Sequence, residues 1–106
     1  IGSIPEDLRK RIIKMSDLSL HLLNDAIEAF LRKDYYLADS IVDKSENIRA
    51  IEDEIIALID EEKNPKNYNI IYVKLILEHI RRTAEYSFDI AEAAMNQIVG
   101  EVIEVR

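Results

Sequence analysis

Carboxylates recur at helical spacing along two stretches of this chain, and they are the residues best suited to chemistry. The acidic residues of the first stretch are Asp39, Asp43, Glu46, Asp53 and Asp60, and those of the second are Glu78, Glu85, Asp89 and Glu92. Spacings of three, four and seven residues place each set along one side of a helix. Oxygen ligands on facing helices are what iron, manganese, magnesium and calcium sites use, so the pattern suggests a divalent metal.

A chain reversal between the two stretches would bring two acidic pairs face to face. Asp39 and Asp89 each lie 25 residues from Asn64, and Asp43 and Glu85 each lie 21 residues from it. Antiparallel helices joined about Asn64 would therefore place the members of each pair at one level. Like charges at that distance repel unless a cation or an arginine neutralises them. We therefore name Asp39, Asp43, Glu85 and Asp89 as candidate ligands of iron, manganese, magnesium or calcium.

Basic residues on the same two stretches support a second interpretation, in which the carboxylates form a solvated surface. These residues are Arg49, Lys74, Arg81 and Arg82. The pairs Glu78–Arg82 and Arg81–Glu85 have the four-residue spacing of helical ion pairs. Charged stripes on long helices are commonly surfaces of this kind, and they contribute little to stability. Spacing alone leaves both interpretations open.

The remaining polar residues do not indicate an enzyme. His21 and His79 are isolated, and the sequence contains no cysteine, no glycine-rich phosphate loop and no HExxH motif. Carboxylate-bridged metal enzymes of the ferritin type normally need Glu-x-x-His pairs on four helices. Ile76 and Leu18 occupy the positions three residues before the two histidines. We therefore predict a binding or regulatory module without catalytic residues, with a carboxylate-bridged metalloprotein as a weaker alternative.

Apolar residues at spacings of three and four predict three helices that position these groups, at about 5–33, 35–62 and 65–99. The first seam is Leu8, Ile12, Met15, Ser19, Leu22, Ala26 and Phe30; the second is Leu37, Ala38, Ile41, Ser45, Ile48, Ile51, Ile55 and Leu58 or Ile59; the third is Val73, Leu77, Ile80, Ala84, Phe88, Ala91, Met95 and Ile98. Asn64 and Pro65 predict the start of the third helix, and Gly100 predicts its end.

Short joints between long helices predict an all-α fold, an antiparallel up-down-up three-helix bundle that forms one domain over residues 1–106. Its core should contain the seam residues of the second and third helices, namely Ile41, Ile48, Ile55, Leu77, Ile80, Ala84 and Ala91. A bundle this slender leaves an apolar groove uncovered, so we expect a homo-oligomer or a place within a longer protein.

Composition limits the partners of this domain. The formal net charge of −7 repels phosphate backbones, so we expect no direct binding of nucleic acid. The apolar runs are far too short to span a bilayer, no secretory leader opens the sequence, and cysteine is absent. These features favour a cytoplasmic protein without membrane insertion.

Two segments of the chain resemble the PhoU domain, the phosphate-uptake regulator family. The segment 22–34 runs into Leu37-Ala38-Asp39-Ser40-Ile41-Val42-Asp43, and the family has an apolar helix followed by an Ala-x-x-(Val/Ile)-x-x-Asp segment. The segment 80–92, which ends Asp89-Ile90-Ala91-Glu92, is similar to the family's signature stretch, Glu-Arg-Ile-x-Asp-His and a closing Asn-Ile-Ala-Glu. The resemblance covers nearly the whole chain, in the family's order.

This resemblance implies a helical bundle that is usually found as tandem repeats and that regulates phosphate transport and the histidine-kinase signalling coupled to it. Some members hold iron or other metal clusters on Glu/Asp-x-x-x-Asp motifs, a form that Asp39–Asp43 and Glu85–Asp89 share. One departure weakens the metal inference. Alignment on Ile90-Ala91-Glu92 places Arg81 where the family has its signature Glu.

Overall fold

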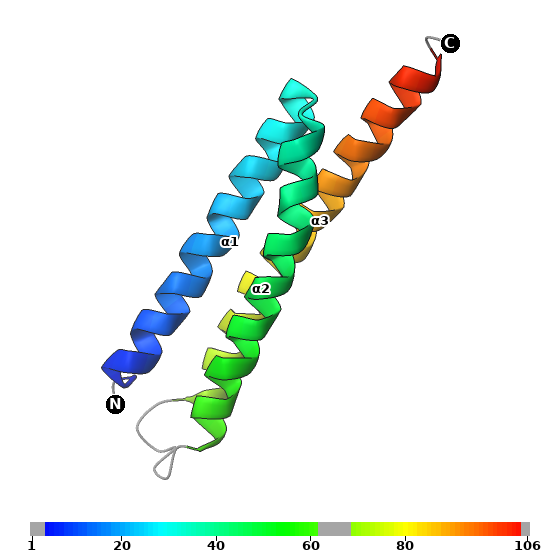
Figure 1. Ribbon diagram of the computed structural model, residues 1–106. Coiled ribbons are helices and arrows are strands. Elements are labelled where there is room, and N and C mark those ends of the chain that lie inside the picture. The colour runs from blue at the N-terminus through cyan, green and yellow to red at the C-terminus, as the bar shows by residue number, and fades with distance from the viewer. Residues whose placement is uncertain (1–3, 62–68, 105–106) are drawn as a thin grey trace.

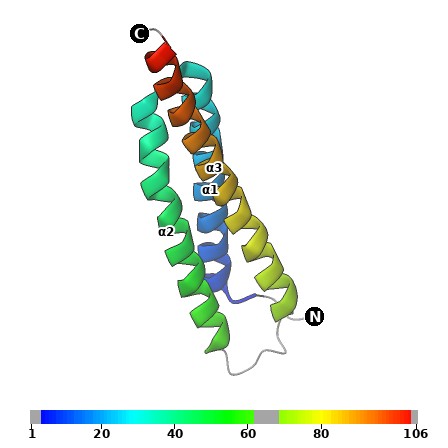
Figure 2. The same cartoon turned by 90° about the vertical axis from the view of Figure 1, so that its right-hand side faces the viewer.

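Three long helices make up the described part of this protein. The computed structural model describes residues 4–61 and 69–104, which contain α1 (Glu6–Arg32), α2 (Tyr35–Asp60) and α3 (Ile70–Glu104). The chain reverses twice, so that α1 and α3 run parallel to each other and α2 runs antiparallel to both (Figures 1 and 2). The resulting rod measures 64 × 17 × 17 Å. The predicted all-α, up-down-up three-helix bundle is therefore confirmed.

The joint between α1 and α2 is built from only two residues. Lys33 adopts a left-handed conformation with φ of 55°, and the Asp34 backbone N–H donates to the Ala29 carbonyl oxygen at 2.9 Å. The Asp34 carboxylate then accepts a hydrogen bond from the Leu37 backbone N–H at 3.0 Å, which caps the first turn of α2. These local bonds end one helix and begin the next, so they force the sharp reversal.

The ends of α3 differ from the prediction. The Asn69 side-chain oxygen accepts hydrogen bonds from the N–H groups of Ile71 and Tyr72 at 3.0 and 3.3 Å, and it caps α3. The predicted cap Asn64 and the predicted first residue Pro65 lie outside the described residues. The predicted stop at Gly100 is wrong, because α3 continues through it to Glu104. One glycine costs a helix only about 1 kcal/mol, too little to end a long helix.

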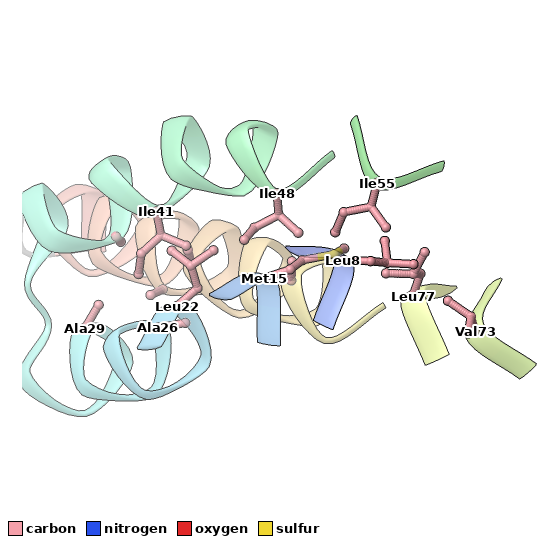
Figure 3. Close-up of a cluster of buried hydrophobic side chains, with 14 of the residues drawn as sticks. Leu8, Met15, Leu22, Ala26, Ala29, Ile41, Ile48, Ile55, Val73 and Leu77 are labelled. Carbon is pink, nitrogen blue, oxygen red and sulfur yellow. The ribbon is translucent and has the colours of Figure 1, made fainter. Parts of the chain in front are cut away.

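Large aliphatic side chains fill the axis of the bundle (Figure 3). Six of the seven predicted core residues of α2 and α3 are buried: Ile41, Ile48, Ile55, Leu77, Ala84 and Ala91. Ile80 is the exception, because it is only partly buried and packs against the edge of the core. On α1, Ala29 is buried in place of Phe30, which remains 42% exposed. The small Ala29 side chain suits the close approach of the helices beside the reversal.

Candidate functional site

An open groove of about 760 Å³ runs between α2 and α3. Small side chains hollow it, because Ser45, Ala50 and Ala84 leave room that larger residues would fill. Its charged lining consists of the carboxylates Glu46, Asp53, Glu85 and Asp89 and the guanidinium groups of Arg49 and Arg81. The groove is therefore the place where the acidic stripes and their basic neighbours meet.

Arg81 joins the two helices at this groove. Its Nε donates to Glu52 Oε2 on α2 at 3.2 Å, and its Nη1 donates to Glu85 Oε1 on α3 at 2.8 Å. Arg49 Nη2 lies 3.6 Å from the same Glu85 oxygen. The Arg81 and Glu52 side chains are only 28% and 11% exposed, so this is the least solvated ion pair among the described residues. Two guanidinium groups thus balance the two carboxylates that they contact.

The electrostatic environment keeps Arg81 charged. The carboxylate of Glu52 raises the pKa of the Arg81 guanidinium above its already high ordinary value, and the charge and hydrogen bond of Glu85 add to this effect. Partial burial of Arg81 acts in the opposite direction and is outweighed by Glu52. Arg81 is therefore a permanent cation at the α2–α3 interface.

Ion pairs between α2 and α3 show how the two helices are aligned along their axes. Arg81 contacts Glu52, Arg49 contacts Glu85, and Lys74 Nζ lies 3.3 Å from Asp60 Oδ1. The midpoint of each pair is about residue 67 rather than residue 64. Relative to the prediction, α3 is therefore displaced along α2 by about six residues, or about 9 Å at the helical rise.

This displacement separates the four predicted metal ligands. Glu85 and Asp89 both line the groove, but Asp39 and Asp43 do not. The ion-pair register places Asp39 and Asp43 level with about residues 95 and 91 of α3, where the side chains are Met and Ala. The prediction that the four carboxylates lie at one level is therefore wrong. Within residues 4–61 and 69–104, no three His, Asp or Glu side chains gather closely enough to hold a metal ion.

Sequence reasoning missed Glu52, although its position carried a signal. Glu52 lies four residues after Ile48 and three before Ile55, so it falls on the buried face of α2. A charged residue on such a face needs a partner, because an unpaired buried charge is strongly unfavourable. Arg81, at the matching position on the seam edge of α3, is that partner. His21 and His79 are both exposed and lie on different helices.

A second exposed feature lies on the opposite flank of α3, toward α1. Ile27, Phe30, Ile90 and Ala93 line an apolar groove of about 300 Å³ between these helices. On α1, Ile27 and Phe30 belong to a second, mostly apolar stripe beside the buried one, which we call the α1 seam. Its members alternate at spacings of three and four: Ile13, Ser16, Leu20, Leu23, Ile27 and Phe30.

The α1 seam is only partly covered by the bundle. Leu20 is 53% exposed and Ile13 is 45% exposed, whereas Ser16 and Leu23 are half-buried. A helix with two adjacent apolar stripes at this spacing is typical of helices that contact partners on two sides. The fold therefore defines a class of protein, a helical bundle with one flank of paired charges and one exposed apolar flank.

Comparison with known protein families identifies the family of this helical bundle. The PhoU domain family matches residues 12–94, which span most of all three helices, so the chain belongs to the PhoU family. No curated protein and no solved structure matches the chain. Among the described residues, no helix has both the length and the apolar character needed to cross a membrane.

Proposed function

We propose that this chain is a regulatory module of phosphate uptake that works in the cytoplasm by binding other proteins rather than by catalysis. Its membership of the PhoU family over residues 12–94 carries this proposal. The exposed α1 seam supports it, because apolar stripes of this kind are common at helix–helix contacts between proteins. The partners of this surface are, first, a second copy of the chain and, second, a protein of the phosphate-uptake or signalling machinery.

A second copy fits the α1 seam in an antiparallel orientation. The six seam residues are symmetric about a point between residues 21 and 22, so a reversed copy aligns every seam residue with another. A parallel copy would instead place each charge level with its own like charge. The internal symmetry of the seam therefore favours the antiparallel homodimer.

A metal on Asp39, Asp43, Glu85 and Asp89 stays a prediction, and the register of α2 and α3 does not favour it. A second candidate function is a helical oligomerisation domain without any ligand. The exposed α1 seam supports that function equally well, because self-association uses the same surface. The two functions differ in what their loss would do in the cell. Loss of an oligomerisation domain without a ligand would not change the regulation of phosphate uptake.

A deletion experiment tests the proposed function. The gene that encodes this chain is deleted in its host, and phosphate uptake and phosphate-starvation transcripts are measured in phosphate-rich medium. A regulator of uptake should leave these transcripts raised several-fold when it is lost. The intact gene should restore repression, and so should a Leu18→Glu control, because Leu18 lies on the side of α1 away from the seam. The Leu20→Glu variant should fail to restore repression. Unchanged uptake and transcripts in the deletion strain would contradict a role in phosphate regulation.

A further inference from the structure

Arg81 occupies a position that the PhoU resemblance assigns to an acid. With Ile90-Ala91-Glu92 aligned to the closing part of the family's signature stretch, Arg81 stands at the place of the signature Glu. In this structure the side chain at that place lies between α2 and α3, where its guanidinium contacts Glu52 and Glu85. The chain thus carries a fixed positive charge where metal-holding relatives would carry a ligand.

The donor set around Arg81 does not fit a divalent metal. Glu52 and Glu85 direct their nearest oxygens at the guanidinium groups of Arg81 and Arg49, so these carboxylates are already neutralised. A divalent cation placed beside them would be repelled by two adjacent positive charges. No third carboxylate contacts Arg81 among the described residues. The cluster is therefore complete without a metal.

We infer that the Arg81 guanidinium takes the place of a metal cation in this bundle, so that the α2–α3 interface is held together independently of divalent metals. The guanidinium is suited to this role because it is planar and permanently charged, and its several N–H groups bind two carboxylates at once. Arg81 lies in the first half of α3 and reaches across to α2, which is what a bridging cation would do. This inference depends on the family membership and is independent of the role in phosphate uptake.

The inference makes a testable prediction for one substitution. Arg81→Glu restores the acidic residue of the family's signature and puts three carboxylates, those of residues 52, 81 and 85, where two now share a guanidinium. In EDTA this variant should be less stable than the unmodified chain, because like charges repel. Manganese at about millimolar concentration should then raise its melting midpoint by about 4 °C or more, since a bound cation stabilises the folded state by mass action.

Two controls separate cation replacement from a general charge effect. Arg81→Gln removes the positive charge without adding a carboxylate, so it should be destabilised but should gain nothing from manganese. Lys74→Glu makes the same charge reversal at an exposed ion pair between the same helices, and it should respond to neither manganese nor EDTA. All variants span residues 1–106, and they are melted in parallel with the unmodified chain and followed by circular dichroism.

The unmodified chain provides the direct measurement. Its melting midpoint should be equal in EDTA and in manganese, and elemental analysis of the purified protein should find no stoichiometric metal. A saturable rise of its midpoint in manganese, or a retained stoichiometric metal, would overturn the inference. An Arg81→Glu chain whose melting midpoint rises in manganese no more than that of Arg81→Gln would also overturn the inference. So would an Arg81→Glu chain that stays unfolded in manganese.

Discussion

The two flanks of α3 differ in chemical character. The flank toward α2 carries charges, and nearby groups within the chain neutralise them: Arg81 contacts Glu52 and Glu85, and Lys74 contacts Asp60. The flank toward α1 carries apolar residues, and Ile90 and Ala93 line a groove that remains open. Charges can be satisfied inside one chain, whereas exposed apolar surface is best covered by another. We therefore propose that the charged flank contributes stability and that the apolar flank mediates association.

Both flanks depend on the core beneath them, so a core truncation should have the largest effect. Ile48 is 1% exposed and faces the axis of the bundle. Ile48→Ala should lower the free energy of unfolding by about 2–5 kcal/mol, because it leaves a cavity that the long helices cannot close. Urea unfolding followed by circular dichroism measures this loss. A loss below about 1 kcal/mol would show that the side chain is not packed as described.

The charged flank should give an intermediate effect at Glu52 and Arg81. Arg81→Met should lower the free energy of unfolding by about 1–2 kcal/mol, because it leaves the largely buried Glu52 carboxylate without its main partner. The double variant Glu52→Gln with Arg81→Met should recover part of that loss, which gives the coupling energy of the pair. Purely additive losses would mean that the two side chains do not interact.

This cycle should be nearly independent of pH in the neutral and alkaline range that is accessible experimentally. The folded state raises the pKa of Arg81, chiefly through Glu52. A group with a raised pKa stabilises the fold below its unfolded-state pKa, and the benefit is lost only as the pH rises through the folded-state pKa. For an arginine that window lies at strongly alkaline pH.

The outer ion pair should have the smallest effect. Lys74 and Asp60 are 45% and 61% exposed, so water and salt screen their attraction. Lys74→Ala should change the free energy of unfolding by less than about 0.5 kcal/mol, with little difference between low and high salt. The same urea titration measures it beside the Arg81 variants. An effect as large as that of Arg81→Met would mean that the burial of an ion pair does not determine its contribution to the free energy of unfolding.

The sequence predicts the apolar parts of this molecule well and the charged parts poorly. Ile41, Ile48 and Ile55 recur every seven residues, and that period identifies both the helix and its buried face. The axial register of α3 relative to α2 cannot be read from this period. The apolar pattern repeats along the helix, so several registers bury the same kinds of side chain. The predicted alignment about Asn64 therefore erred by nearly two turns, and it paired Asp39 with the wrong part of α3.

The arginine cluster illustrates the same limit. Glu85 and Arg81 have the spacing of a helical ion pair, so their contact was predictable, and the structure confirms it. Glu52 is separated from Arg81 by 29 residues, and only the tertiary register brings them together. Local spacing thus reveals contacts within a helix, whereas contacts between helices require the register that packing decides.

Light scattering of the purified chain at high micromolar concentration tests the central claim about the apolar flank most directly. We expect a mass near twice the 12.3 kDa of the single chain. Leu20→Glu should reduce the mass to that of a monomer without unfolding the bundle, because it places a charge in the α1 seam. The matched control Leu18→Glu, on the same helix but away from the seam, should remain dimeric. A monomeric unmodified chain, or a Leu20→Glu variant that stays dimeric, would contradict the assignment of association to this flank.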